Sequence, residues 1–264
     1  MSQRTENGSR IEHAAASVSL PWLGESCVST LDRCGNRLLM RLPAADRRRL
    51  LSGHEPTELF VSDVLTRPGR RIHHVFFPID SFVSVISSVD RYERLEVGLV
   101  GNEGMLGASL ALGDGHSPAL SLVLGAGLAW RVEATTFRRE LELSAALRRG
   151  VSGYLQVSLT QLARVAVCMR FHHLDARLAR WLLMARDRAP SNRFRVTHES
   201  LAYVLGVRRA GVTRAASALQ ARGLIEYKRG NVMVRDRRRL EAVACSCYRS
   251  AKETYGRVFA GGIR

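Results

Sequence analysis

Residues 207–222 predict a helix whose outward side chains are suited to binding an anion. Its apolar positions recur at helical spacing and would form the buried side: Val212, Ala215, Ala216 and Leu219. The opposite side is polar and cationic: Arg208, Arg209, Thr213, Arg214 and Gln220. A guanidinium group binds phosphate, and it can also donate two parallel hydrogen bonds to O6 and N7 of guanine. The chemistry expected of this helix is therefore recognition of DNA in the major groove.

The flanking residues predict the elements that hold this helix. A shorter amphipathic helix precedes it, with an apolar stripe formed by Leu201, Ala202 and Leu205. The hydroxyl of Thr197 can cap that shorter helix, and Gly206 allows the positive φ of a sharp turn between the two. Gly223 ends the second helix, and two short β-type runs then flank a turn at residues 229–231. This order predicts a winged helix-turn-helix.

Each outward residue has an expected role at the DNA. Arg209 lies in the first turn, where a side chain reaches the groove floor, and Arg214 is the second candidate for a base or an adjoining phosphate. Arg208 opposes the helix dipole, so a nearby phosphate is its expected compensation. Residues that flank the groove are expected to fix the register on the phosphate backbone. The full expected set is Thr197, His198, Arg208, Arg209, Thr213, Arg214, Lys228 and Arg229.

The basic surplus of the chain is concentrated around the same stretch. The 264 residues include 40 Lys and Arg and 24 Asp and Glu, a net charge of +16. Residues 173–240 hold 16 basic and 5 acidic residues, whereas residues 1–172 hold 20 and 17. A surplus confined to one segment is the electrostatic footprint of a DNA-binding module, so double-stranded DNA is the expected partner.

The chain divides into five expected segments, and the fold class is α+β. Between Asn36 and Leu51 the pattern predicts short helices, and after them short, evenly spaced apolar runs predict an antiparallel jelly-roll sandwich or barrel. The absence of an 18-residue apolar run predicts no membrane span and a cytoplasmic protein. The expected segments are a mobile tail (1–35), the jelly roll with its short helices (36–140), a long helix (141–172), the winged helix-turn-helix (173–248) and a C-terminal tail (249–264).

The long helix has a wider apolar face than one neighbour needs. Its apolar positions are Leu147, Val151, Tyr154, Leu155, Leu159, Leu162, Val165, Ala166 and Met169. A broad apolar face between two domains is typical of a dimer seam. The alternative is that the helix packs only on its own jelly roll. We prefer a homodimer because a two-fold protein matches palindromic operators.

The cysteines predict neither a disulfide framework nor a metal site. They are five in number and scattered, so free thiols are expected. Cys245 and Cys247 are too close for a C-x-x-C metal knuckle and have no partner pair in the sequence, and a redox role is the alternative for them. Cys27 and Cys34 alone do not supply the four thiolates of an iron–sulfur cluster. No metal and no cofactor are expected.

In this order, the jelly roll, long helix and winged helix-turn-helix resemble the Crp/Fnr family of bacterial transcription regulators. The resemblance extends from about Asn36 to Tyr248 and is most specific in its C-terminal part. It implies a sensory domain like those that bind cyclic nucleotides, a homodimer on palindromic operators and contact with RNA polymerase. It does not imply which effector, if any, the sensory domain binds.

Two departures from the family pattern change these expectations. Cyclic-nucleotide-binding members use a Gly-Glu pair for the ribose, which residues 101–104 only loosely approximate, and an arginine for the phosphate, where this chain has Pro118 and Ala119. A phosphate buried without a cation is costly, so neither cyclic AMP nor cyclic GMP is expected to bind. In the recognition helix, Ala210 stands where the family often has glutamate. An operator unlike the usual half-site is therefore expected.

Two other functions fit parts of the sequence. A jelly roll with histidines could be a cupin-like metal-dependent enzyme, but adjacent His73 and His74 would point to opposite faces of a strand, and His116 lies in a glycine loop. No Ser-His-Asp set or phosphate-binding glycine loop accompanies them, so the chain is predicted not to be an enzyme. An architectural DNA-binding protein would use the jelly roll as a spacer. An effector-dependent change in DNA affinity would separate a sensor from such a protein.

Overall fold

The computed structural model describes residues 35–89 and 94–260. The mobile tail expected over residues 1–35 lies outside this range apart from Gly35, as do Cys27 and Cys34. No helix in the described range combines the length and the apolar composition that a membrane span requires.

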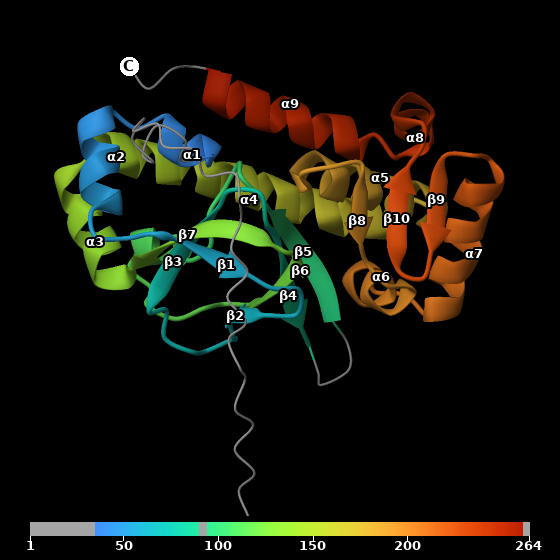
Figure 1. Cartoon of the computed structure of the whole chain (residues 1–264), viewed down its shortest axis with the longest axis horizontal. Coiled ribbons are helices and arrows are strands. Elements are labelled where there is room, and N and C mark those ends of the chain that lie inside the picture. Colours follow the sequence, from blue (N-terminus) through green and yellow to red (C-terminus); the bar gives the residue numbers. More distant parts are fainter. Residues whose placement is uncertain (1–34, 90–93, 261–264) are drawn as a thin grey trace, which may run out of the picture.

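Two antiparallel sheets face each other in the N-terminal half of the chain (Figure 1). The first has the order β1–β7–β3 and consists of Pro56–Leu59, Gly127–Glu133 and His74–Pro78. The second has the order β2–β6–β4–β5 and consists of Val64–Thr66, Leu120–Gly125, Phe82–Ser88 and Arg94–Val100. Side chains from both sheets, among them Phe76 and Ala129 from one and Val83 and Val123 from the other, fill the space between them. This arrangement confirms the predicted antiparallel sandwich.

Helices cover one side of the sandwich (Figure 1). They are α1 (Arg37–Met40), α2 (Ala44–Leu51), α3 (Ala134–Leu143) and the start of α4 (Ala145–Phe171), and the short 3-10 helix η1 (Ala108–Leu112) lies near them. The buried side chain of Asn36 caps α1 by accepting from two backbone N–H groups, and it donates to the carbonyls of Pro78 and Gly104. Ser144 separates α3 from α4, because its hydroxyl accepts from the backbone N–H of Leu147 and caps α4. The short helices predicted between residues 36 and 51 are confirmed.

The long helix α4 is buried at one end and exposed at the other. Leu147, Val151, Tyr154 and Val157 pack into the core beneath the sandwich. Beyond Ser158 most of the apolar side chains face solvent in the single chain, and Leu159 is 66% exposed, although Cys168 is buried. The apolar face predicted as one surface is therefore two surfaces, of which only the second is free for another molecule.

The C-terminal tail expected over residues 249–264 is wrong for most of its length. Residues Cys247–Ala260 form helix α9, which runs back along α4 (Figure 1). Gly153 of α4 allows this close approach, because a Cβ there would lie 3.2 Å from a methyl group of Val258. Phe259 is buried in the core beneath the sandwich, and the hydroxyl of Tyr255 donates to the backbone carbonyl of Glu103. The sequence signal was the helical spacing of aromatic residues.

The C-terminal domain contains the predicted winged helix-turn-helix. Helix α5 (Leu174–Arg188) precedes strand β8 (Arg193–Arg195) and helices α6 (His198–Leu205) and α7 (Arg209–Ala221). Strands β9 (Ile225–Lys228) and β10 (Asn231–Val234) form the wing, and α8 (Arg237–Val243) follows. The apolar residues predicted to face inward on α6 and α7 are buried in one core, together with Leu178, Trp181 and Leu182 of α5. Strand β8, which pairs with β10, is an element that the sequence analysis missed.

One continuous core joins the C-terminal domain to the sandwich. Phe82 of β4 meets Phe194 of β8 edge to face, with ring centroids 6.4 Å apart. Leu99 and Leu124 of the sandwich belong to the same buried cluster as Trp181 and Leu182 of α5. The position of the helix-turn-helix relative to the sandwich is therefore set by packed side chains.

Candidate nucleic-acid interface

The turn between α6 and α7 has the geometry that the sequence predicts. Gly206 adopts a φ of +61°, in the left-handed region where a side chain would be strained. A Cβ at Gly206 would also lie 3.3 Å from Leu95 of β5, so the turn packs closely on the sandwich. The hydroxyl of Thr197 caps α6 by accepting from the backbone N–H of Ser200 at 3.0 Å, as predicted. These contacts fix where α7 begins.

The outward face of α7 is cationic and unpaired. Arg208, Arg209 and Arg214 are exposed, and α7 lies at the end of the molecule that is remote from most of the sandwich (Figure 1). No carboxylate within the described residues forms an ion pair with any of these three arginines. The N-terminus of α7 has no side-chain cap, because Arg208 stands at the capping position. Three positive charges and a positive helix end thus face solvent without a partner among residues 35–89 and 94–260.

His198, Thr213 and Tyr227 connect α6, α7 and the wing. The imidazole of His198 stacks on the ring of Tyr227 with centroids 4.3 Å apart, and its Nδ1 lies 3.1 Å from the hydroxyl of Thr213. Its Nε2 is buried without a hydrogen-bond partner in the described part of the chain. Burial, and then the charge of Arg209, lower the pKa of His198, so the ring is neutral at neutral pH. Unlike the arginines, His198 is not freely available to a phosphate.

The wing carries its cations at a tight two-residue turn. Asn231 pairs with Lys228, which leaves Arg229 and Gly230 as the turn, with φ values of +50° and +79°. Two positive φ values are characteristic of the type I′ turn that suits a hairpin. Lys228 and Arg229 are exposed at its tip.

Strand β8 adds two cations that the sequence analysis did not include. Arg193 and Arg195 alternate with the buried Phe194, so both point outward from the edge of the wing sheet. Arg195 pairs with Asn231 next to the wing turn, which places it on the same side as Lys228. The signal was the Arg-Phe-Arg alternation, which is too short to identify a strand by itself. Of the eight predicted residues, the structure places seven on the surface of one domain and His198 half-buried among them.

Comparisons with known proteins identify this domain and its architecture. Residues 176–243 match the model of the Crp-like helix-turn-helix domain. FixK2 from Bradyrhizobium japonicum has a TM-score of 0.62 at 13% identity, covering 73% of this chain and 98% of that one. The c-di-GMP-responsive global regulator CLP from Xanthomonas campestris has a TM-score of 0.59 at 19% identity, covering 74% and 100%. TTHA1359, a Crp/Fnr-family transcriptional regulator from Thermus thermophilus, has a TM-score of 0.57 at 18% identity, covering 72% and 98%. No curated protein matches the chain.

The C-terminal domain is a Crp-like helix-turn-helix domain, and the chain as a whole has the fold of Crp/Fnr-family transcription regulators. The domain match carries the assignment, and the shared architecture of sandwich, long helix and helix-turn-helix agrees with it. The matched domain and the shared fold favour a DNA-binding regulator over the cupin-like alternative. In the structure, His73 and His116 are exposed and His74 is half-buried.

The sandwich contains an apolar cavity of about 440 Å³. It lies between the second sheet, η1 and α4, and Pro118 and Ala119 line it together with Tyr154 and Leu162. None of its lining residues is charged. The phosphate-binding arginine that Pro118 and Ala119 replace is therefore not supplied by any other residue that lines the cavity.

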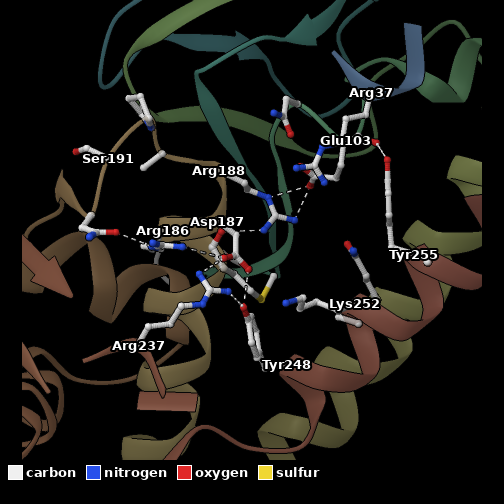
Figure 2. A pocket seen from close by; sticks show the side chains of 18 residues that line it. Arg37, Glu103, Arg186, Asp187, Arg188, Ser191, Arg237, Tyr248, Lys252 and Tyr255 are labelled. Atoms are coloured by element: carbon white, nitrogen blue, oxygen red, sulfur yellow. Dashed lines mark hydrogen bonds and ion pairs between the residues drawn. The ribbon is translucent and has the colours of Figure 1, made fainter. Parts of the chain in front are cut away.

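A second cavity, of about 700 Å³, lies between the sandwich, the end of α5 and α9 (Figure 2). The Nε of Arg188 donates to the Glu103 carboxylate over 2.9 Å, and both side chains are largely buried. Asp187 accepts from Arg237 and from the hydroxyl of Tyr248, each over 2.6 Å (Figure 2). Glu103, the carboxylate of the Gly-Asn-Glu-Gly segment, thus holds the DNA-binding domain instead of facing the apolar cavity.

Four residues that the sequence analysis did not combine also meet near the domain boundary. Cys245 and Cys247 have no partner pair in the sequence, but the fold brings possible partners to them. The thiol of Cys168 and the imidazole of His172, both at the end of α4, lie beside them. Because 77 residues separate Cys168 from Cys245, local spacing carried no signal of this meeting.

Proposed function

We propose that this regulator binds palindromic operators as a homodimer, with one α7 helix in the major groove of each half-site. The observation that supports this most directly is the unpaired cationic face of α7, which a matched Crp-like domain presents away from the sandwich. DNA phosphates and guanine edges would supply the acceptors that the protein itself does not provide.

The exposed half of α4 supports the dimer. Leu155, Leu159, Leu162, Ala166 and Met169 follow one another at spacings of four and three residues, which is the repeat of a coiled-coil seam. Leu159 and Leu162 are exposed in the single chain, and Met169 borders on exposure. The occupant that fits is the same helix of a second copy, because a two-fold axis along α4 would place two α7 helices for a symmetric operator.

The proposed contacts divide into base reading and backbone binding. Arg209 reads a guanine from the first turn of α7, and Arg214 binds a second base or the next phosphate. Arg208, Thr197, Thr213, Lys228 and Arg229 bind the phosphate backbone, and Arg195 of β8 joins them. We assign His198 a positioning role, because its ring is held between Tyr227 and Thr213.

The apolar cavity supports a sensory role for the sandwich. Its volume suits a small molecule, and its uncharged wall favours an uncharged ligand over a cyclic nucleotide. Leu159 and Leu162 line the cavity and also belong to the proposed dimer seam. A ligand there would touch the surface through which two subunits meet. RNA polymerase is the proposed partner in transcription, and the cytoplasm the proposed location.

In vitro selection from random duplex DNA tests this function. The full chain should enrich a motif with two inverted half-sites, whose centres lie about one helical turn, or 34 Å, apart. A double variant Arg209→Ala, Arg214→Ala should lose the enrichment, whereas Arg149→Ala, an exposed arginine on α4, should keep it. Recovery of random sequence by the unaltered chain would instead indicate an architectural protein.

A further inference from the structure

Three thiols and one imidazole converge at the boundary between α4 and the DNA-binding domain. Cys168 and His172 lie one helical turn apart at the C-terminal end of α4, Cys245 follows α8, and Cys247 begins α9. Their donor atoms all lie within 4.8 Å of one another. The Sγ atoms of Cys168 and Cys245 are 3.5 Å apart, and Sγ of Cys247 is 3.6 Å from Nδ1 of His172.

These separations fit the edges of a small tetrahedron. Zinc bonds of about 2.3 Å to sulfur and about 2.0–2.1 Å to nitrogen place neighbouring ligand atoms roughly 3.4–3.8 Å apart. The separations of 3.5 Å between Cys168 and Cys245 and of 3.6 Å between Cys247 and His172 fall in this range. Three cysteines with one histidine is also a common ligand set for structural zinc. The set is complete without a water molecule, which is typical of structural sites and not of catalytic ones.

Burial and charge around the cluster also suit a metal–thiolate centre. Cys168, Cys245 and Cys247 are each less than 9% exposed. Arg180 lies close enough to all three thiols to favour their charged forms, and the buried Arg177 lies near two of them. Neither arginine forms an ion pair with a carboxylate in the described residues, and the Nε of each is buried without a hydrogen-bond partner. A zinc ion with three thiolates carries a net negative charge that would balance a buried guanidinium.

We propose that Cys168, His172, Cys245 and Cys247 bind one Zn²⁺ ion as a structural site. The ligands flank the Crp-like domain on both sides, because two precede residue 176 and two follow residue 243. The ion ties the end of α4 to the start of α9 and closes the DNA-binding domain at its base. The site is independent of the proposed operator recognition, since none of its ligands lies on α6, α7 or the wing.

A disulfide between Cys168 and Cys245 is the competing use of these residues. It would need an oxidant, and it would leave Cys247 and His172 without a role in a buried polar cluster. Zinc uses all four donors and requires only that the thiols lose their protons. The two uses predict different products, one a zinc-loaded chain and the other a metal-free oxidised chain.

Metal analysis of the full chain tests the proposal. Protein expressed with added zinc and purified without chelator should retain about one zinc ion per chain by plasma mass spectrometry. Replacement of the zinc by Co²⁺ should give sulfur-to-cobalt charge-transfer bands and the intense visible bands of a tetrahedral site. His172→Ala and Cys247→Ser should retain almost no zinc. His173→Ala, at the exposed neighbouring position, and the double variant Cys27→Ser, Cys34→Ser should retain it fully.

Three results would overturn the zinc site. One is an unaltered chain that takes up no zinc, and another is equal zinc content in the His172→Ala and His173→Ala proteins. The third is recovery of Cys168 and Cys245 as a disulfide from reducing buffer. The Co²⁺ spectrum of the unaltered chain decides the matter even if a variant fails to fold. All these readouts are independent of DNA, so they stand whether or not the operator proposal holds.

Discussion

The indole nitrogen of Trp181 donates a hydrogen bond to the carboxylate of Glu96 over 2.9 Å, in the core that joins the DNA-binding domain to the sandwich. Ser84 donates to the other carboxylate oxygen over 2.6 Å. Burial raises the pKa of Glu96 from 4.5 to about 7, although these two hydrogen bonds and the charges of Arg180 and Arg188 act in the opposite direction. The contact between the domains therefore contains a carboxyl group that titrates near neutral pH.

This shift predicts a pH-dependent stability that Glu96→Gln removes. Between pH 4.5 and about 7 the folded chain keeps a proton that the unfolded chain loses, so this group lowers the free energy of unfolding as the pH rises. The loss is about 1.4 kcal/mol for each unit of pKa shift. A glutamine can still accept from Trp181 and donate to Ser84. In urea unfolding at several pH values, the free energy of unfolding of the variant should increase relative to that of the unaltered protein as the pH rises to about 7.

The matched control is Glu58→Gln, at an exposed position on β1. This variant should follow the pH dependence of the unaltered protein. If Glu96→Gln also follows it, then Glu96 is not the titrating group.

Arg209→Ala is predicted to relax selectivity at one base pair of each half-site. The loss of a bidentate contact should remove roughly 1–3 kcal/mol of discrimination there. Binding of the variant to single-base operator variants measures this directly, with Arg149→Ala as the control. Full selectivity in the Arg209→Ala protein would assign base reading to another residue.

Lys228→Ala is predicted to weaken binding to every sequence by the same factor. Its side chain is exposed beside the wing turn, where we propose that it binds the phosphate backbone and no base. The slope of log affinity against log salt should become shallower by about one unit. Titrations at several salt concentrations, on operator and on unrelated duplex, provide the measurement. Losses that differ between the two DNAs would contradict a backbone role.

Leu159→Glu is predicted to prevent formation of the proposed homodimer. A charge at this point of the α4 seam would be buried without a partner in the dimer but remains in solvent in the single chain. Leu143→Glu is the control, because Leu143 is exposed to nearly the same degree, 64% against 66%, at the end of α3. Light scattering after size exclusion should give a monomer for the first variant and a dimer for the second. A monomeric unaltered protein would contradict the seam itself.

The sequence predicted those parts of the structure that depend on local spacing. The inward residues of α7, the turn at Gly206 and the cap by Thr197 follow from the types and spacing of neighbours. Strand β8 was missed because three residues carry too little pattern, although Arg193 and Arg195 alternate around Phe194. Helix α9 was expected to be a tail, although Tyr248, Tyr255 and Phe259 recur at helical spacing. Its packing partners lie far away in the sequence, on α4 and at Glu103.

Contacts between residues far apart in the sequence could not be predicted from local spacing. The bond from Trp181 to Glu96 joins residues 85 positions apart, and the thiols of Cys168 and Cys245 meet across 77. Neither residue of such a pair has a local signature, since the first pairing arises only when α5 meets β5 and the second only when the end of α8 meets the end of α4. Glu103 is a further example of a long-range contact. It lies in the segment that loosely resembles a ribose-binding pair, but Arg188 of the DNA-binding domain donates a hydrogen bond to it.

The two chain segments that connect the DNA-binding domain to the rest of the molecule lie side by side. The chain enters through His172 and leaves through Cys245, and α9 then returns along α4. Two connections at one point allow the DNA-binding domain to rotate about that point, but they oppose its translation away from the rest of the molecule. A rotation of the DNA-binding domain about this point would change the distance between Phe82 and Phe194, whose rings are in contact here. A pair of spectroscopic labels near these two positions would therefore report the rotation.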